Sequence, residues 1–238
     1  TNRKGAYSPV WAHASISASS AVVYRGLYRS ASTTWAQEGC QVHALTILAN
    51  DHEAEKVWFW NGFGLTVVDA IRPITPLQQA IFHPLRIRKA ESADLALVMQ
   101  LDIEHWKHYT EPPVFMAPHQ IDDEATYREF IDDPSNGVWL AFWGEEAIGF
   151  MRFESHNQGG TEIVQSETTI AITGAYIRPQ YRGRGASPAL LDTALEDYQS
   201  QGFDRCSVVF ESFNPEAAKF WMKYFEPVCY SLIRCPED

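Results

Sequence analysis

The segment YRGRGAS, residues 181–187, concentrates arginine and glycine in an otherwise acidic chain. Gly183 and Gly185 have no Cβ atom, so the backbone there can adopt positive φ angles and approach a ligand closely. Arg182 and Arg184 can add charge-assisted hydrogen bonds of the kind that phosphate oxygens accept. These residue types predict an anion site, for which the alternative is a basic loop on a solvated surface.

The residues that follow predict how this loop is positioned. The sequence ALLDTALEDYQS repeats apolar residues at a helical period, so the loop is expected to begin a helix. Ser187 is predicted as the N-cap and Pro188 as the first helical residue. The amides of residues 183–187 would then converge at the positive end of the helix dipole. A Walker-type nucleotide loop is a poorer match, because YRGRGAS is too short and has no lysine.

The composition limits the kinds of partner. A formal net charge of −11 argues against a broad nucleic-acid surface and is compatible with a cationic or amine substrate. No apolar run approaches the ~20 residues of a membrane span, and the first residues show no signal-peptide pattern. The four cysteines have no metal-binding spacing and predict reduced thiols. We therefore expect a cytoplasmic protein that acts without nucleic acid, membrane or metal; the oligomeric state stays open.

The second half of the chain predicts a mixed α/β fold. Alternating and helical patterns follow one another in the order β-α-α-β-β-β-α-β-α-β, which favours a mixed sheet with helices on both faces. Ser92 is predicted to cap the first helix, and Gly144 to lie in the turn of a hairpin. The predicted elements are residues 85–90, 91–106, 123–132, 137–144, 146–155, 168–179, 187–202, 206–210, a helix from 214 and a last strand.

The first half repeats the later part of this order. Its helical stripe contains Tyr24, Leu27, Tyr28, Ala31 and Trp35, and Gly39 closes it. Ala54, Trp58 and Gly62 then match Ala217, Trp221 and Phe225 at identical spacing. Such self-similarity predicts two related domains, divided as residues 1–75, a proline-rich linker 76–84, and a complete domain 85–238. The opening strands of the first copy either lie upstream or are absent.

Two motifs resemble the GNAT superfamily of N-acetyltransferases. IRPQYRGRGASPALL looks like its acyl-CoA pyrophosphate loop, Gln/Arg-x-x-Gly-x-Gly/Ala, with Arg182 and Gly185 at the first two fixed positions. Ser187 departs from the pattern at the third, where it is still small and can itself bond a phosphate. NPEAAKFW, residues 214–221, looks like the family's Asn-x-x-Ala segment. The element order from Leu85 onward also resembles this fold, a GNAT-like acyl-CoA N-acyltransferase fold.

The resemblance implies acetyl-CoA as co-substrate. A strand at Ala175–Ile177 would diverge from its neighbour and offer backbone groups to pantetheine. The residues expected to bind the cofactor are Ala175, Tyr176, Ile177, Arg182, Gly183, Arg184, Gly185, Ala186, Ser187, Asn214, Phe220 and Trp221.

The first copy departs from this pattern. An ungapped alignment places Ser19 at the position of Arg182, and Val22 and Val23 at those of Gly185 and Ala186. Because β-branched side chains block close approach and carry no charge, this copy is predicted to bind no cofactor.

The expected chemistry is acyl transfer from a thioester to an amine, which needs a neutral amine and a protonated leaving thiolate. By the resemblance, Trp221 stands where many members have the acidic tyrosine, and an indole N–H is no proton acid. Ala171 stands where many members have the basic glutamate. Glu211, at a strand end, is the preferred replacement base, and Glu167 is the second choice.

Other side chains extend the site predictions. Trp106, Tyr109 and Phe115 are expected to line an acceptor pocket or to pack in the core. His105 and His108 lie one helical turn apart, but without a third ligand we expect no metal.

Two functions therefore stay open at this point. The first is an N-acetyltransferase acting on a small-molecule amine or a protein amine. The second is a non-catalytic acyl-CoA-binding or scaffold protein, in which the missing tyrosine and glutamate reflect lost chemistry.

Overall fold

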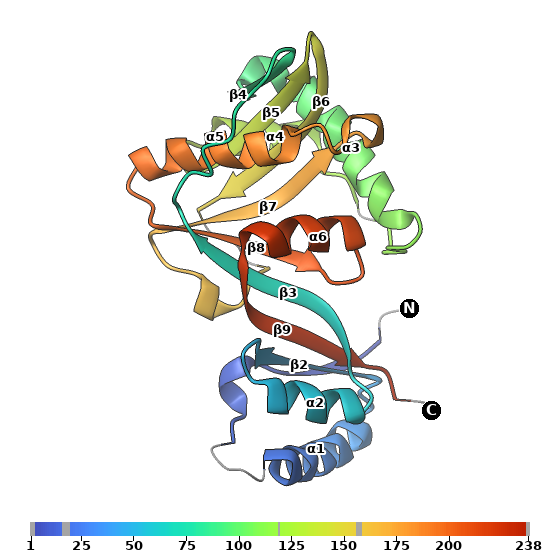
Figure 1. Ribbon diagram of the computed structural model, residues 1–238. Helices are drawn as coiled ribbons and strands as arrows, with labels where there is room; N and C mark the ends of the chain where they lie inside the picture. The colour runs from blue at the N-terminus through green and yellow to red at the C-terminus, as the bar shows by residue number, and fades with distance from the viewer. Residues whose placement is uncertain (1–2, 16–19, 119, 156–158, 237–238) are drawn as a thin grey trace. The chain divides into compact units, whose positions relative to one another are not determined.

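The computed structural model describes residues 3–15, 20–118, 120–155 and 159–236, and Figure 1 shows its elements. The chain forms two compact units. We call Thr1–Ala70 with Phe210–Asp238 the N-terminal unit, and Ile71–Val209 the central unit. None of the described helices is both long and apolar enough to cross a membrane.

The central unit contains a mixed five-stranded sheet. Its strand order is β8-β7-β6-β5-β4, antiparallel from β4 to β7 and parallel between β7 and β8. Its elements are β4 (Leu85–Lys89), α3 (Leu95–Thr110), α4 (Glu124–Asp132), β5 (Gly137–Trp143), β6 (Glu146–Glu154), β7 (Thr169–Ile177), α5 (Ala186–Ser200) and β8 (Arg205–Glu211), the last of which ends beyond the unit.

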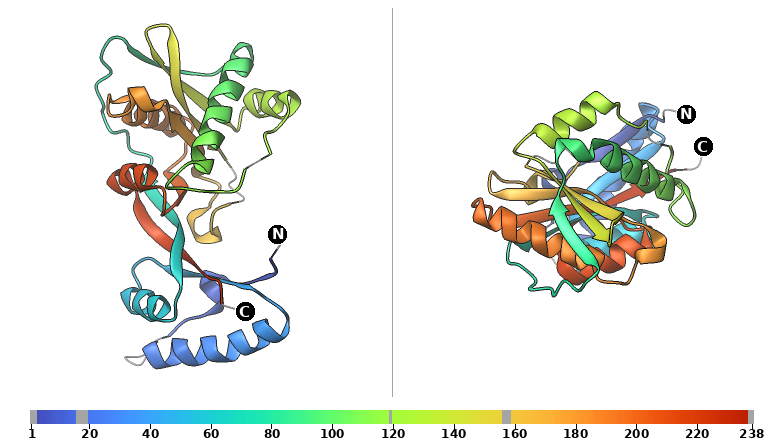
Figure 2. Two further views of the ribbon diagram at one scale, coloured as in Figure 1. Left: turned by 90° about the vertical axis from the view of Figure 1, so that its right-hand side faces the viewer. Right: turned by 90° about the horizontal axis from the view of Figure 1, so that it is seen from above.

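Helices cover both faces of this sheet, as Figure 2 shows. Phe150 of β6 packs in a core cluster with Leu101 of α3 and Tyr127 of α4. Phe153, three residues later, points to the opposite face, where its ring lies 5.2 Å from that of Tyr198 of α5. The predicted mixed α/β fold is therefore confirmed.

Two predicted helix caps are wrong. Ser92 lies in a short 3-10 helix (Ser92–Asp94) whose capping box is made by Glu91 and Asp94. The Ser92 hydroxyl instead donates to Asp132 Oδ1 at 2.6 Å, joining α3's entry to the end of α4. Helix α5 begins at Ala186 with Gly185 as its N-cap, so Ser187 lies in the first turn.

The strands of the N-terminal unit follow in the order β1-β2-β9-β3. β1 and β2 pair in parallel, β2 and β9 antiparallel. Its elements are β1 (Gly5–Ser8), α1 (Ser20–Gln37), β2 (Val42–Leu48), α2 (His52–Trp60), most of β3 (Gly64–Pro73), α6 (Pro215–Tyr224) and β9 (Glu226–Arg234). The last strand of the chain thus lies between two strands from its beginning.

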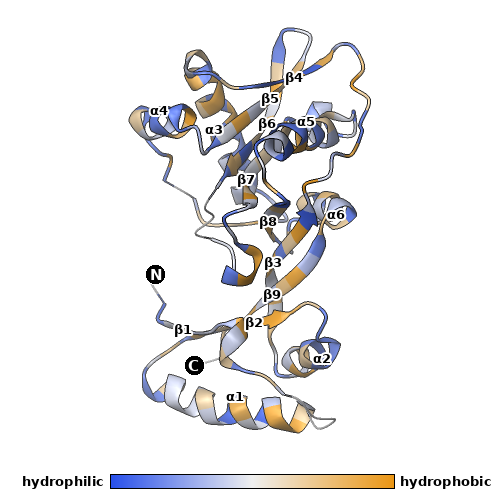
Figure 3. Cartoon of the chain, turned by 90° about the vertical axis from the view of Figure 1, so that its left-hand side faces the viewer, coloured by the Kyte–Doolittle hydropathy of each residue, from blue (hydrophilic) through white to orange (hydrophobic). Residues whose placement is uncertain are grey.

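Aromatic side chains fill the core of the N-terminal unit. Tyr24 and Tyr28 of α1 pack with Trp58 of α2 and Phe63. Hydrophobic and hydrophilic residues are mixed along α1, as expected for a helix with one side on a sheet (Figure 3). Leu27 is 46% exposed, which corrects its predicted burial. It directly precedes the buried Tyr28, so it lies about 100° away around the helix and points away from the buried side.

Asp192 of α5 anchors the segment between β3 and β4. Its carboxylate, 5% exposed, accepts the backbone N–H groups of Leu77, Gln78 and Gln79. This interaction fixes the proline-rich segment, which has no regular structure of its own, against a helix.

Replacing Asp192 by alanine is expected to lower the free energy of unfolding by about 2–3 kcal/mol, because it removes three hydrogen bonds to a buried carboxylate. Urea unfolding followed by tryptophan fluorescence measures the change. The exposed Glu196 on the same helix provides the control, and its substitution by alanine should change stability by no more than about 0.5 kcal/mol. Equal effects of the two substitutions would contradict the anchoring role.

Candidate functional site

The glycine loop before α5 has the backbone geometry of an anion site. Gly183 and Gly185 have φ angles of 75° and 87°, in the left-handed region that favours glycine. A Cβ at either position would meet no atom within 4 Å, so the loop borders open space. The first amides of α5, which follow directly, have no acceptor within a helix and carry its positive dipole end.

The two loop arginines are held in different ways. Arg182 donates from Nε to the carbonyl oxygen of Ile177 at 3.0 Å, which ties the loop to the end of β7. The guanidinium of Arg184 lies 5.4 Å from the ring of Trp143 and 5.6 Å from that of Tyr181. Both arginines thus belong to the loop that leads into α5 and contact residues of its surroundings.

Arg178 fixes the end of β7, just before the loop. Its guanidinium binds the Glu104 carboxylate of α3 in a bidentate pair, at 2.9 and 2.7 Å, and Glu146 Oε1 at 3.1 Å. The hydrogen bond from Arg178 holds the pKa of Glu104 below its usual value. The strand that carries Ala175–Ile177 is thereby clamped to α3 and to the β5–β6 hairpin.

The strands beside this end of β7 are unusually arranged. The parallel ladder between β7 and β8 ends at the pair Ile172 and Val208, while β7 continues to Ile177. On the other side, β6 approaches so closely that a Cβ on Gly149 would lie 2.2 Å from the carbonyl oxygen of Tyr176. Residues 174–177 thus keep β6 as their partner beyond the point where the ladder to β8 stops.

The structure divides the predicted site residues between the two units. Arg182 to Ser187 and Ala175–Ile177 gather in the central unit. Glu211, half-buried at the end of β8, and Asn214, Phe220 and Trp221 belong to the N-terminal unit. Asn214 caps α6, its Oδ1 accepting the amide of Ala217 at 3.2 Å.

Glu167 lines a polar cavity of about 260 Å³ in the central unit. The other lining residues are Ser155, Gln165, Ser166, Thr169, Ala171 and Ser207. Ala171, where the family resemblance led us to expect a glutamate, faces this cavity. Glu167 itself is exposed in the turn before β7.

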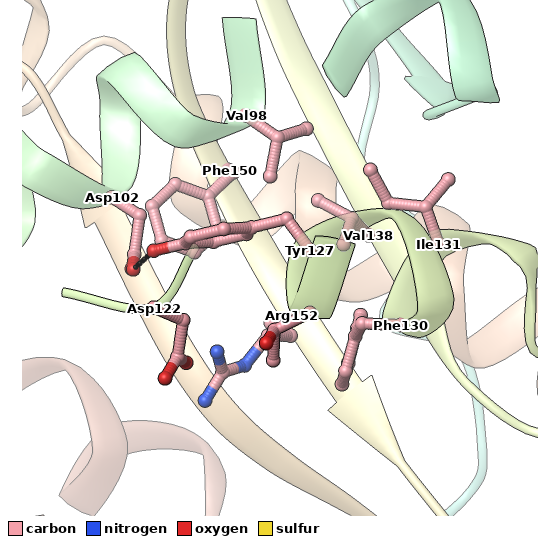
Figure 4. Close-up of a pocket in the computed structure, with 10 residues that line it drawn as sticks. Val98, Asp102, Asp122, Tyr127, Phe130, Ile131, Val138, Phe150 and Arg152 are labelled. Atoms are coloured by element: carbon pink, nitrogen blue, oxygen red, sulfur yellow. Dashed lines mark hydrogen bonds between the residues drawn. The ribbon is translucent and has the colours of Figure 1, made fainter. Parts of the chain in front are cut away.

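A second, smaller cavity of about 40 Å³ lies between α3, α4 and the sheet (Figure 4). Tyr127 donates its hydroxyl proton to Asp102, and the side chains of Asp122 and Arg152 lie across the cavity from them. Burial alone would raise the pKa of Asp102, but hydrogen bonds from His105 and Tyr127 outweigh it and the pKa is lowered. The Asp102 carboxylate is therefore charged inside the core.

The aromatic residues expected to line an acceptor pocket or to pack in the core have different surroundings. Trp106 donates from Nε1 to Asp102 at 3.2 Å, and the ring of His105 lies 4.9 Å from that of Tyr109. His105 is 6% exposed, whereas Phe115 is 70% exposed. Among the described residues, no three His, Cys, Asp or Glu side chains are grouped as metal ligands.

Asp102, Arg152 and Glu154 form polar contacts that were not predicted from the sequence. Arg152 donates from Nε to Thr173 Oγ1 at 3.0 Å, and Thr173 donates to Glu154 Oε1 at 2.5 Å. The signal was present in MRFES, where two charged residues alternate with apolar ones on a predicted strand.

Val22 and Val23, which the sequence alignment places at Gly185 and Ala186, lie near the start of α1 and are 71% and 38% exposed. Ser19, aligned with Arg182, lies outside the described residues.

Comparisons with known proteins agree with this architecture. Residues 101–225, more than half of the chain, match the family model described as acetyltransferase (GNAT) family. A GCN5-related N-acetyltransferase from Sphaerobacter thermophilus is similar in structure with a TM-score of 0.61 at 13% identity, covering 91% of this chain and 71% of that one.

Two further structures share the fold over most of the chain. One, from Kribbella flavida, is also a GCN5-related N-acetyltransferase, with a TM-score of 0.50, 10% identity, and coverage of 91% and 77%. The other is a functionally unknown conserved protein from Staphylococcus epidermidis ATCC 12228, with a TM-score of 0.52, 9% identity, and coverage of 92% and 82%. No curated protein matches the chain.

Proposed function

Because the chain belongs to the acetyltransferase (GNAT) family, we propose that it transfers the acetyl group of acetyl-CoA to the nitrogen of an amine acceptor. The observation that carries this proposal is the loop of the central unit, in which Gly183 and Gly185 adopt positive φ directly before α5. A loop of this geometry presents backbone amides and two arginines to one anion, which fits the pyrophosphate of the co-substrate.

Different residues of the central unit bind different parts of acetyl-CoA. Amides of residues 183–187 hold the pyrophosphate, and Arg182 and Arg184 supply positive charge. The backbone of Ala175–Ile177 holds the pantetheine arm where the ladder to β8 has ended. Bound acetyl-CoA supplies the activated acyl group, so the protein has only to position an amine and handle protons.

Proton transfer requires groups other than the indole of the last helix. Trp221 is 5% exposed and has no acidic proton, so it cannot protonate the leaving thiolate. The amine must reach the thioester neutral, which requires a carboxylate or water as proton acceptor. Glu211 and Glu167 are the two carboxylates that the sequence suggests for this step.

We also propose that residues 1–75 are a degenerate copy of the later fold, followed by a linker at 76–84 and the complete copy at 85–238. The helices α2 and α6 support it, because Asp51 and Asn214 cap them in the same way. Each accepts the amide three residues later, at 2.9 Å from Ala54 and 3.2 Å from Ala217. Trp58 and Trp221 follow at equal spacing, both buried.

Replacing Arg182 by alanine is expected to weaken acetyl-CoA binding by about 1.5–3 kcal/mol, the range for a hydrogen bond to a charged group. Calorimetric titration measures both the affinity and a stoichiometry of one per chain. Arg205→Ala is the control, because this exposed arginine starts β8 beside Thr169, at the opposite end of β7 from the loop. Two equal sites, or no loss in the Arg182 variant, would contradict the loop assignment.

Release of free thiol from acetyl-CoA tests the activity itself. The panel of acceptors contains small-molecule amines and peptides with a free N-terminus or lysine. Amine-dependent thiol release with matching acetylated product supports the transferase. Tight acetyl-CoA binding without release for any acceptor would instead support the acyl-CoA-binding scaffold.

A further inference from the structure

We infer that the cavity beside Ala171 is the acceptor site for a small polar amine, and that Glu154 binds the acceptor's ammonium group and takes its proton. This inference rests on the proposed acetyltransferase function. It assigns the carboxylate role to β6, a strand on which the family resemblance placed no catalytic residue.

Strand register places Glu154 beside the missing glutamate. Ala171 of β7 is the antiparallel Cα partner of Glu154 of β6. Directly paired residues point to the same face of a sheet, with Cβ atoms about 4.5–5.5 Å apart. A carboxylate on Glu154 therefore occupies the face and the level of the sheet that a glutamate at position 171 would have reached.

The surroundings of Glu154 hold one of its oxygens and leave the other available. Thr173 donates to Oε1 at 2.5 Å, and Arg152 Nε lies 3.5 Å from the same atom. Within the described residues, Oε2 has no hydrogen-bond partner. The side chain is 26% exposed, so it is oriented by the protein and still open to a ligand.

The cavity beside Ala171 has polar residues in its wall that suit an acceptor, although Glu154 itself is not one of them. Its wall includes Ala171, the partner of Glu154, and Ser155, its chain neighbour. Ser155, Ser166, Thr169 and Ser207 are among its lining residues. These residues match an acceptor that carries its own hydroxyl or amide groups beside the amine. The volume of about 260 Å³ lies below the ~300–1,000 Å³ of pockets for larger ligands, so it takes a small amine or the end of a longer one.

The proton and bond changes balance with Glu154 as acceptor. The carboxylate removes one proton from the ammonium group, and the nitrogen lone pair then forms the C–N bond to the thioester carbonyl carbon. The C–S bond breaks, and the thiolate takes the second proton that the nitrogen loses. Glu154 returns its proton to water, so the products are the amide, the free thiol and one proton.

Glu154 is favoured over Glu167 by its fixed orientation, although Glu167 and not Glu154 lines the cavity. Glu167 is exposed in the turn before β7, whereas Thr173 and Arg152 orient Glu154. Glu211 ends β8, the strand that carries the lining residue Ser207. Parallel Gln substitutions at the three positions compare them directly.

Acetylation of 2-aminoethanol by acetyl-CoA provides the test. Glu154→Gln keeps the shape and the Thr173 contact, and is expected to lower kcat/KM by about 10²-fold or more while leaving the acetyl-CoA Kd unchanged. The loss should shrink as pH rises, because the amine then deprotonates in solution. Glu162→Gln is the control and should keep full activity, because Glu162 is an exposed glutamate in the connection between β6 and β7.

Two further measurements separate a chemical role from a structural one. The double variant Glu154→Gln/Ala171→Glu places a carboxylate on the paired position of β7. Its kcat/KM should be at least about tenfold higher than that of Glu154→Gln alone. The wild-type protein should acetylate 2-aminoethanol about tenfold better than propylamine, which has the same size but lacks the hydroxyl.

The outcomes distinguish this inference from the proposed function. If the wild-type protein acetylates no amine at all, the proposed function fails. If it acetylates amines and Glu154→Gln keeps full activity at every pH, or loses it without recovery by Ala171→Glu, the role of Glu154 is overturned. Equal or faster turnover of propylamine overturns the polar acceptor class.

Discussion

Replacing Gly149 by alanine is expected to lower the free energy of unfolding by at least about 3 kcal/mol. The new methyl group would lie 2.2 Å from the Tyr176 carbonyl oxygen, and 2.5 and 2.9 Å from the Cδ1 and Cα atoms of Ile177. Two of these atoms are backbone, so no rotamer change relieves the overlap. The strands β6 and β7 must separate, in a sheet that packs against helices on both faces.

Gly174 provides the matched control for this substitution. It lies in the same β6–β7 ladder, and a Cβ there would meet Phe150 and Arg152 at 3.4–3.7 Å, which is ordinary contact. Gly174→Ala should change stability by no more than about 1 kcal/mol. Urea unfolding of both variants measures the difference, and equal small effects would show that β6 and β7 do not approach each other in this way.

Gly185→Val is expected to lower acetyl-CoA affinity by at least about 100-fold, or roughly 3 kcal/mol. At φ 87° an L side chain strains the backbone by about 1–2 kcal/mol, more when it is β-branched. The side chain would also project into the open space next to the amides that we propose hold the pyrophosphate. Valine is what the first copy carries at the aligned position, Val22, so the variant tests why that copy is predicted to bind nothing.

A glycine at the other end of α5 provides a control that distinguishes backbone strain from loss of contact with the ligand. Gly202 follows α5 with φ 95°, and a Cβ on it would also meet no atom within 4 Å. Gly202→Val should lower stability as much as Gly185→Val but leave acetyl-CoA affinity unchanged. Calorimetric titration of both variants measures their acetyl-CoA affinities. An equal loss of affinity in the two variants would show that Gly185→Val acts through folding alone.

Local signals predicted most of the central unit. The hairpin at Gly144 needs only two alternating strands and a turn, and the structure has it. Helix N-caps were predicted less well, because neighbouring residues can take the capping position from a serine or hydrogen-bond its hydroxyl. A left-handed glycine at position 185 starts α5 two residues before Ser187, and Asp132 takes the hydroxyl of Ser92.

The candidate site depended on features that no local pattern contains. Glu154 faces the same side as Ala171 because the β6–β7 register shifts between Arg152 and Phe153. Without that irregularity the later pairs would fall one residue apart, and the charged side chains of β6 would meet different partners. The place of β9 between β2 and β3 is likewise set by contacts between distant segments.

The pairing of β2 with β9 also sets the order in which the protein can acquire its structure on the ribosome. Thr46 and Ser231, whose hydroxyls bond at 2.9 Å, are 185 residues apart in sequence. At about 5–20 residues per second, β2 emerges roughly 10–40 s before its partner strand. The contiguous central unit can fold during that interval, while β2 keeps an unpaired edge and its aromatic cluster lacks Leu232. Nascent chains that stall before residue 226 therefore expose an edge that a second stalled chain can pair with, so completing synthesis is itself what protects the N-terminal unit from aggregation.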